Sequence, residues 1–174
     1  FSIFLFLLNN LSFAEDFYFE GDEIEIINNG EILKSKKGVK ITSSSGVIIT
    51  AQEFEYNKKN LELSVNKNVL LNDKINNLII KTDKIKYFKN VEQIQTFEDT
   101  VIEIEKNIII TTKNLIYSRN LNEIKSKYKT SVKDSHENSF ITDDFVLNTS
   151  SKILKAKDVT LKDTDGNISY FKSF

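Results

Sequence analysis

The chain repeats one short segment at a nearly fixed interval. Ile49–Tyr56 recurs as Ile80–Tyr87 and Ile110–Tyr117, a weaker copy is Phe140–Leu147, and an earlier half copy is Ile24–Ile26. The last residues of successive copies lie 30 or 31 positions apart. A fixed period of this size indicates one supersecondary unit used repeatedly.

Within each copy, apolar residues alternate with polar ones, which is the periodicity of a strand. Ile49 and Ala51 alternate in this way. Phe54 and Tyr56 alternate too, but in the opposite parity. One straight strand would place the two pairs on opposite faces. We therefore expect a bulge or bend at Gln52–Glu53, so that all four side chains face the interior.

The rest of each unit also has the pattern of strands. After a polar turn, Leu61–Val65 alternates strictly, Asn66–Asn68 interrupts it, and Val69–Leu71 follows. The segments between polar breaks are shorter than a typical helix and rich in β-branched residues. One unit is therefore two to three short antiparallel strands, and the predicted fold class is all-β.

Composition excludes several classes of function. The 174 residues carry 24 basic and 25 acidic side chains, so no basic field would attract nucleic acid or an anionic membrane surface. Cysteine is absent, which excludes a disulfide framework and a thiolate metal site. Without a linker or a shift in composition, we expect a single domain.

The two ends of the chain have distinct patterns. Residues 1–14 carry no charge, and small residues stand at Ser12 and Ala14, before Glu15. We predict a truncated signal peptide at 1–14, followed by one domain at 15–174; a buried N-terminal strand is the alternative. Ile168–Phe171 begins a fifth repeat, so we expect the domain to be truncated at its C-terminal end, with an unpaired edge strand there.

Residues with the chemistry of an active site are scarce. His136 is the only histidine and lies in a polar turn. Asp163–Asn167 has part of the pattern of a calcium loop but lacks its distal glutamate, so we expect a hairpin turn. We expect no enzymatic activity, no metal and no cofactor. The repeated aromatic positions could line a ligand site, and ordinary core is the alternative for them.

The repeat resembles a known family. Its pattern is Ile-x-Ala/Thr-x-x-Phe/Ile/Leu-x-Tyr, then a Lys/Asn turn, an alternating strand and a closing Asn-Val-x-Leu-x-Asp strand. Ile49–Asp73 matches best, and Asp158–Asp163 repeats the ending. The pattern is similar to the OstA-like (organic-solvent-tolerance) domain of lipopolysaccharide transport proteins, over about Phe17 to Tyr170. The resemblance implies an open, twisted antiparallel β jelly roll with an apolar interior.

The resemblance also implies a function. Such a domain would hold the acyl chains of lipopolysaccharide in an apolar groove while the sugars stay outside, and would stack by edge strands on other OstA-like modules. The implied groove residues in this chain are Ile49, Ala51, Phe54, Tyr56, Leu63, Ile80, Ile85, Tyr87, Ile110, Leu115, Tyr117, Phe145 and Leu147.

Among family members, we prefer the N-terminal part of the outer-membrane assembly protein (LptD-type). The reasons are the incomplete fifth repeat and the opening Phe19–Ile26. That choice implies a periplasmic location, attached to the outer membrane through a C-terminal barrel, with the barrel and its lipoprotein as partners. The lack of cysteine departs from many such members. The alternatives are the soluble periplasmic bridge protein (LptA-type) and a structural β-solenoid or surface adhesion module with a packed interior.

Overall fold

The computed structural model describes residues 17–173, and the predicted signal peptide at 1–14 lies outside them. These residues form a 17-stranded antiparallel sheet with no α-helix among them. The first strands are β1 (Phe17–Glu20), β2 (Glu25–Ile27), β3 (Ile32–Ser35), β4 (Val39–Ser43), β5 (Val47–Ala51), β6 (Glu53–Asn57), β7 (Glu62–Asp73), β8 (Leu78–Phe88) and β9 (Gln93–Ile104). The remaining strands are β10 (Ile108–Lys113), β11 (Ile116–Ser118), β12 (Glu123–Ser126), β13 (Thr130–Asp134), β14 (Ser139–Thr142), β15 (Asp144–Asn148), β16 (Ile153–Lys162) and β17 (Ile168–Ser173).

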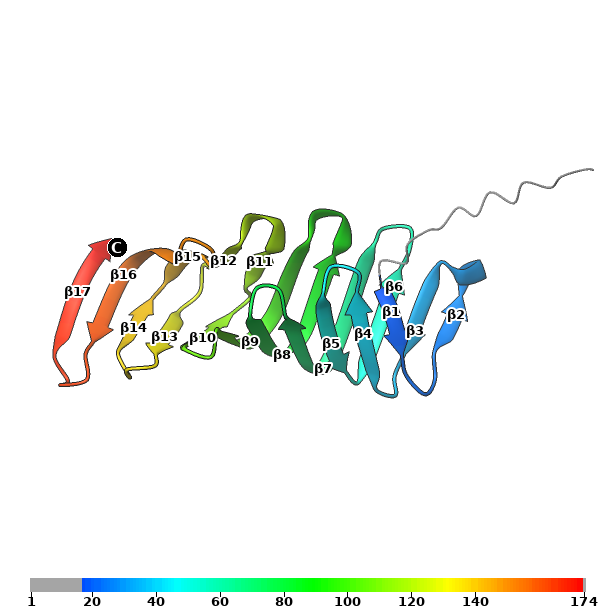
Figure 1. Ribbon diagram of the computed structural model, residues 1–174, viewed down its shortest axis with the longest axis horizontal. Helices are drawn as coiled ribbons and strands as arrows, with labels where there is room; N and C mark the ends of the chain where they lie inside the picture. Colours follow the sequence, from blue (N-terminus) through cyan, green and yellow to red (C-terminus); the bar gives the residue numbers. More distant parts are fainter. Residues whose placement is uncertain (1–16, 174) are drawn as a thin grey trace, which may run out of the picture.

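The sheet is folded along its length into two layers, and the molecule is elongated, with β1 and β2 near one end and β17 at the other (Figure 1). The first layer contains β1, β4, β5, β10, β13, β14 and β17. The second contains β2, β3, β6, β11, β12 and β15. The long strands β7, β8, β9 and β16 cross from one layer to the other. The predicted all-β class is confirmed.

Hairpin turns lie along the free edge of each layer. We call them the first-layer turns and the second-layer turns. The first-layer turns are 44–46, 74–77, 105–107, 135–138 and 163–167. The second-layer turns are 28–31, 58–61, 89–92, 119–122 and 149–152, and three of them contain short 3-10 segments, η1 (Asn28–Gly30), η2 (Lys89–Val91) and η3 (Arg119–Leu121).

The change of parity in the repeat occurs where the chain passes from one layer to the other, and we call this place the fold line. Gln52 separates β5 from β6, and Ile49, Phe54 and Tyr56 are all buried, with Ala51 packed against the same core. The predicted bend is therefore confirmed. In the next copy the same step is a bulge in β8 at Asp83, where the register with β9 shifts.

The intervening strands bend through residues with left-handed backbone. Lys67 and Asn68 in β7 have φ of 66° and 53°, Glu98 in β9 has 77°, and Asp158 in β16 has 49°. A side chain with a Cβ rarely adopts positive φ, so each of these residues carries strain that the surrounding sheet must offset. A backbone irregularity thus marks the fold line in each of the long strands β7, β8, β9 and β16.

A row of buried hydroxyl groups follows the fold line. Thr100 donates to Thr96 over 2.7 Å, and Thr112 and Thr130 share a hydrogen bond of 2.7 Å. The amide of Leu115 donates to the Thr96 hydroxyl over 2.9 Å. Because a bend interrupts the backbone ladder, side-chain hydroxyls are needed to pair the groups that it releases. No buried side-chain nitrogen or oxygen in residues 17–173 lacks a partner.

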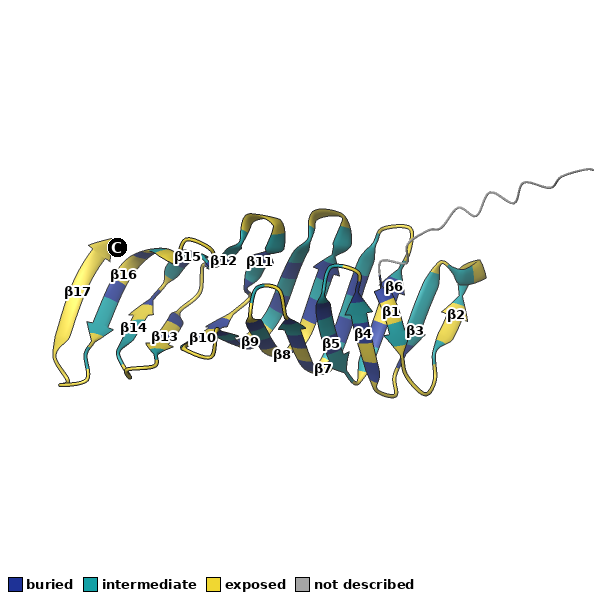
Figure 2. Ribbon diagram, in the orientation of Figure 1, coloured by how far each residue is buried: buried dark blue, intermediate teal, exposed yellow. Residues whose placement is uncertain are grey.

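The space between the layers is an apolar core that is complete in the middle of the molecule. The inward row Ile49, Leu71, Ile80, Ile102 and Ile110 has exposed fractions of 0–1%. Figure 2 shows this buried middle, and it also shows that β17 is exposed along its described length. The buried core therefore does not extend as far as β17.

Candidate apolar binding site

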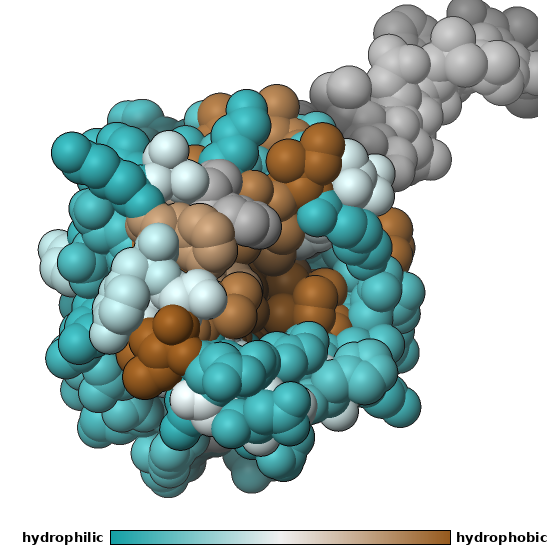
Figure 3. Space-filling view, turned by 90° about the vertical axis from the view of Figure 1, so that its left-hand side faces the viewer, coloured by the Kyte–Doolittle hydropathy of each residue, from teal (hydrophilic) through white to brown (hydrophobic). Residues whose placement is uncertain are grey.

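The interior opens into a cavity at the C-terminal end of the molecule. The cavity has a volume of about 420 Å³, and we call it the C-terminal chamber. Seen from this end, apolar side chains fill a hollow that is framed by polar residues (Figure 3). The lining residues are Ile108, Val132, Phe140, Leu154, Val159, Leu161 and Phe171, together with Asp134, Asn138 and Ser139 around the β13–β14 turn.

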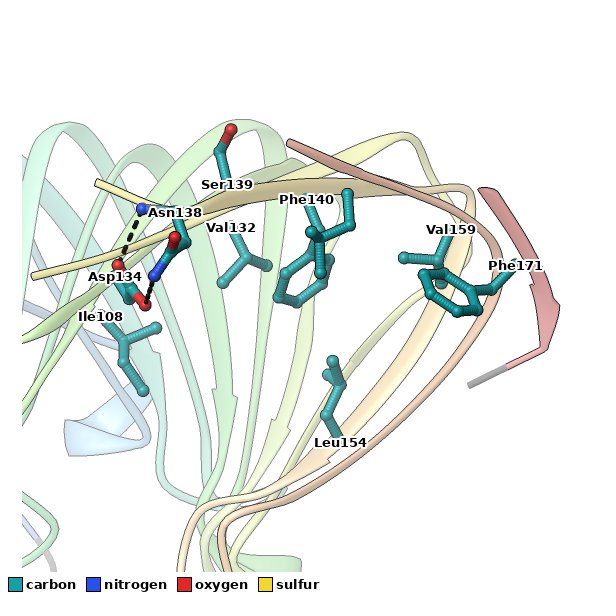
Figure 4. Close-up of a pocket in the computed structure, with 10 residues that line it drawn as sticks. Ile108, Val132, Asp134, Asn138, Ser139, Phe140, Leu154, Val159 and Phe171 are labelled. Carbon is teal, nitrogen blue, oxygen red and sulfur yellow. Dashed lines mark hydrogen bonds between the residues drawn. The ribbon is translucent and has the colours of Figure 1, made fainter. Parts of the chain in front are cut away.

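The chamber continues the apolar rows of the core. Ile110 in β10 pairs with Val132, Val132 with Phe140, and Phe140 with Leu161 across successive strands. Along this row the side chains change from fully buried at Ile110 to 7% exposed at Val132 and partly buried at Phe140 and Leu161. The close-up shows the phenyl rings of Phe140 and Phe171 in the chamber, with Leu154 from another part of its wall (Figure 4).

The chamber exists because the two layers are offset. Asp73, beside one first-layer turn, contacts Arg119 in a second-layer turn 46 residues later, and Glu105 contacts Lys152, 47 residues later. A second-layer turn opposite the first-layer turn at 135–138 would, by this spacing of 46–47 residues, lie beyond position 173. Residues 17–173 therefore contain no turn opposite it. The first layer therefore extends past the second, and its inward face is left open.

The polar turn beside the chamber is held by its own residues. The Asp134 carboxylate accepts the amides of His136 and Asn138 at 2.9 and 3.0 Å, and also the Asn138 side chain at 2.9 Å. These hydrogen bonds, led by the one from the Asn138 side chain, lower the pKa of Asp134. The chamber thus has a fixed, negatively charged polar corner and an otherwise apolar wall.

A buried charged cluster joins the two rows of turns over the middle of the molecule. Nε of Arg119 donates to Asp73 over 2.6 Å, and its terminal nitrogens donate to the hydroxyl and the carbonyl of Ser45 over 2.8 and 2.9 Å. Arg119 also pairs with Glu92. The side chains of Arg119 and Asp73 are 7% and 0% exposed. We call these residues, with Tyr87, Lys89 and Tyr117, the Arg119 cluster.

Two tyrosines anchor the cluster in the core. The hydroxyl of Tyr117 donates to Asp73 over 2.9 Å, and that of Tyr87 donates to Glu92 over 2.6 Å. Burial, reinforced by the neighbouring carboxylates, raises the pKa of both phenols. Burial alone would raise the pKa of Asp73, but hydrogen bonds from Arg119 and Asn76 outweigh it and hold that pKa below its usual value. Glu92 has a lowered pKa as well, since hydrogen bonds from Lys89, Tyr87 and Arg119 outweigh its burial.

The implied groove residues are all interior, but they do not line the chamber. Ile110 and Leu147 come nearest in register, because they pair with the lining residues Val132 and Leu154. The others belong to the packed core or its margin. A role for these residues in binding lipid stays a prediction. The implied groove residues that are buried or packed against the core are Ile49, Ala51, Phe54, Tyr56, Leu63, Ile80, Ile85, Tyr87, Ile110, Leu115, Tyr117, Phe145 and Leu147.

Sequence reasoning missed the Arg119 cluster, although a signal was present. Arg119 is the only arginine in the chain, and every other basic side chain except His136 is a lysine. It stands two residues after the tyrosine that ends the third copy of the repeat. The equivalent residues are Lys89 in the second copy and Thr149 in the fourth, where Leu147 replaces the tyrosine. The fourth copy thus lacks both cluster side chains at the place where the interior opens.

Other polar motifs are structural. The Asp163 carboxylate accepts the amide and the side chain of Asn167, both at 2.8 Å, and Gly166 has φ of 86°, which confirms the predicted hairpin turn. His136 is exposed in its turn. Within residues 17–173, no group of three or more histidine or acidic side chains is placed to hold a metal ion. The same residues contain no helix long and apolar enough to cross a membrane.

Some solved structures are distantly similar to this chain. No family model and no curated protein matches the chain. LptH from Pseudomonas aeruginosa, described as the LptA homologous periplasmic component of the conserved lipopolysaccharide transport device, is 12% identical, with 89% of this chain and 93% of that chain covered and a TM-score of 0.33. The TCP10 domain of Danio rerio CPAP, in complex with a STIL peptide, is 13% identical, with 90% and 99% covered and a TM-score of 0.17. Neither likeness is strong enough to assign a shared fold or function.

Proposed function

We propose that this chain is a non-enzymatic module that binds acyl chains of lipopolysaccharide during transport through the periplasm. The observation that carries the proposal is the C-terminal chamber, an apolar cavity that continues the core and opens to solvent at one end. Its volume of about 420 Å³ lies within the range of ligand sites, which are mostly apolar cavities with a few polar groups. The repeat pattern of the sequence supports the same function.

The chemistry of the chamber fits a lipid with a large polar headgroup. Each methylene removed from water contributes about 0.8 kcal/mol, and the lining offers aliphatic and phenyl groups from five strands. Sugars and phosphates would remain outside, among the polar residues that frame the opening. No step of this binding requires a metal, a cofactor or a nucleophile.

The offset of the layers also supports association between modules. At the C-terminal end the first layer projects, with β17 paired only to β16 among the described strands. At the other end β2 pairs only with β3. Such edges can accept a strand from a neighbour by β-augmentation. We propose stacking on other OstA-like modules, with the outer-membrane assembly role and its barrel and lipoprotein partners preferred to a soluble bridge.

The packed middle of the molecule favours one competing function. Leu63, Ile85 and Ile94 are completely buried, as expected for a structural β-solenoid or adhesion module that holds nothing inside. In that case the chamber would be only the unfinished end of a packed core. Ligand binding in the chamber separates the two functions.

Two neighbouring residues of β14 provide a matched test. Phe140 points into the chamber, whereas Ile141 is on the outer face and 40% exposed. We expect wild-type protein and Ile141→Asp to bind purified lipopolysaccharide, and Phe140→Asp to lose most binding because a charge would face the acyl chains. Thermal melts would confirm that both variants fold. Failure of folded wild-type protein to bind, or equal binding by both variants, would support the structural β-solenoid instead.

A further inference from the structure

We propose that the Arg119 cluster is a latch, which holds the two rows of turns together and thereby sets how far an acyl chain can enter from the C-terminal chamber. The proposal rests on the proposed function and deepens it, because it concerns the size of the ligand and the route to the interior. It follows from the position of the cluster, its burial and its distribution among the repeats.

The cluster lies where the two layers would separate. Ser45 and Asp73 belong to the first-layer side, whereas Glu92 and Arg119 lie in second-layer turns. The Arg119 guanidinium reaches Ser45 in one first-layer turn and Asp73 at the strand end beside the next. Nearer the C-terminal end, the layers are joined by Lys152 and Glu105, and both of those side chains are 48% exposed. The buried connection is therefore over the middle of the molecule.

The interior beneath the cluster is apolar like the lining of the chamber, but it is packed. Tyr87 and Tyr117 extend from the cluster into the core, and Tyr117 pairs in register with Ile94 and Ile124, which are fully buried. From Tyr117 the inward row continues through Ile124 and Leu147 to the chamber residue Leu154. Separation of the turns would therefore loosen an apolar row that leads to the chamber. A row of aliphatic side chains could close the same gap permanently, whereas an ion pair can part when its members are solvated.

The repeat places the latch and the chamber in adjacent units. Copies two and three contribute Tyr87 with Lys89 and Tyr117 with Arg119 to the latch. Copy four carries Leu147 and Thr149 at these positions, and its Leu147 neighbours the chamber residue Leu154. The interior is thus closed at copies two and three, which carry latch side chains, and opens into the chamber at copy four, which lacks them.

A series of fatty acids of increasing length tests the latch. Binding would be measured by displacement of a fluorescent apolar dye. We expect the affinity of wild-type protein to rise about fourfold for each added methylene, and then to stop rising when the chamber is filled. In Arg119→Lys, whose single ammonium cannot hold Asp73 and Ser45 together as the guanidinium does, and in the neutral pair Asp73→Asn with Arg119→Met, the rise should continue to longer acids. We expect these variants to bind the longest acid at least about tenfold more tightly than wild type does.

The controls separate the latch from the proposed function. Glu105→Gln removes the exposed connection between the layers and should keep the length limit of wild type. Arg119→Lys keeps a cation beside Asp73 and Glu92, so it leaves no buried charge unpaired and decides the question if the double variant fails to fold. An unchanged length limit in folded latch variants overturns the latch. Absence of binding by wild type at every length overturns the proposed function.

Discussion

The two ends of the molecule are built from the same repeat but are closed differently. At the N-terminal end an aromatic cluster fills the interior: Phe19 stacks on Phe54 with ring centroids 4.8 Å apart, and Phe17 meets Tyr56 and Tyr87 edge-on at 5.2 and 5.3 Å. At the C-terminal end the corresponding space is the chamber. Because both ends expose an overhanging layer, the difference lies in the side chains that the terminal strands supply.

The strands at the two ends show why one end is filled. β1 carries Phe17, which is 2% exposed, and Phe19, which packs against the core. In β17 the residue paired with the chamber residue Leu161 is Ser169, and Phe171 stays 42% exposed. Two inward phenylalanines complete the core at the N-terminal end, whereas β17 offers the chamber only Phe171 and the small side chain of Ser169. The chamber is therefore a property of the terminal strand and of the layer offset, and not of the repeat itself.

The largest expected effect on stability comes from removing a ring from the filled N-terminal end. Phe17→Ala should lower the free energy of unfolding by about 3–5 kcal/mol, because it removes a buried ring and leaves a cavity. Phe171→Ala at the hollow end should cost less than about 1 kcal/mol, since its ring is already partly exposed. Urea denaturation of both variants checks the comparison. Equal losses would show that the two ends are packed alike.

Filling the hollow end should raise the free energy of unfolding. Ser169→Phe would place a ring beside Leu161 and Phe140, and cavity filling commonly adds about 0.5–2 kcal/mol of stability. The same variant should lose binding of acyl chains, because the ring takes their place. Thermal melts and the dye displacement assay measure the two effects on one sample. A variant that gains stability and still binds as wild type would place the lipid elsewhere.

The middle of the molecule should be sensitive to acid. The pKa of Asp73 is lowered by Arg119 and Asn76 against the effect of burial, and that of Glu92 by Lys89, Tyr87 and Arg119. A lowered folded pKa contributes stability above the unfolded value of about 4, and this contribution is lost as the pH falls through the folded value. We expect the melting temperature to fall steeply below about pH 4. Asp73→Asn should flatten this fall more than Asp163→Asn, a change at an exposed carboxylate that also has a lowered pKa.

The fold was predictable from local pattern, whereas the site was not. The odd step between Ala51 and Phe54 predicts the fold line, because strand parity is a local property. The chamber depends on the offset between layers, which relates residues such as Glu105 and Lys152 that are 47 positions apart. The Arg119 cluster depends on the same long-range geometry. The solitary arginine, and its replacement by Thr149 in the fourth copy, mark the cluster in the sequence but do not name its partners.

The smallest expected effect concerns association through the hollow end. β17 presents Ile168 and Tyr170 on its outer face, with exposed fractions of 54% and 76%, beside an edge that can accept another strand. We expect the protein to associate head to tail as its concentration rises. Lysine on an edge strand opposes such pairing, so Tyr170→Lys should weaken association by about 1 kcal/mol, or roughly fivefold, as measured by sedimentation. Tyr128→Lys, at an exposed tyrosine between β12 and β13, should leave it unchanged. A strictly monomeric wild type would contradict the proposed stacking of modules while leaving the chamber itself able to bind.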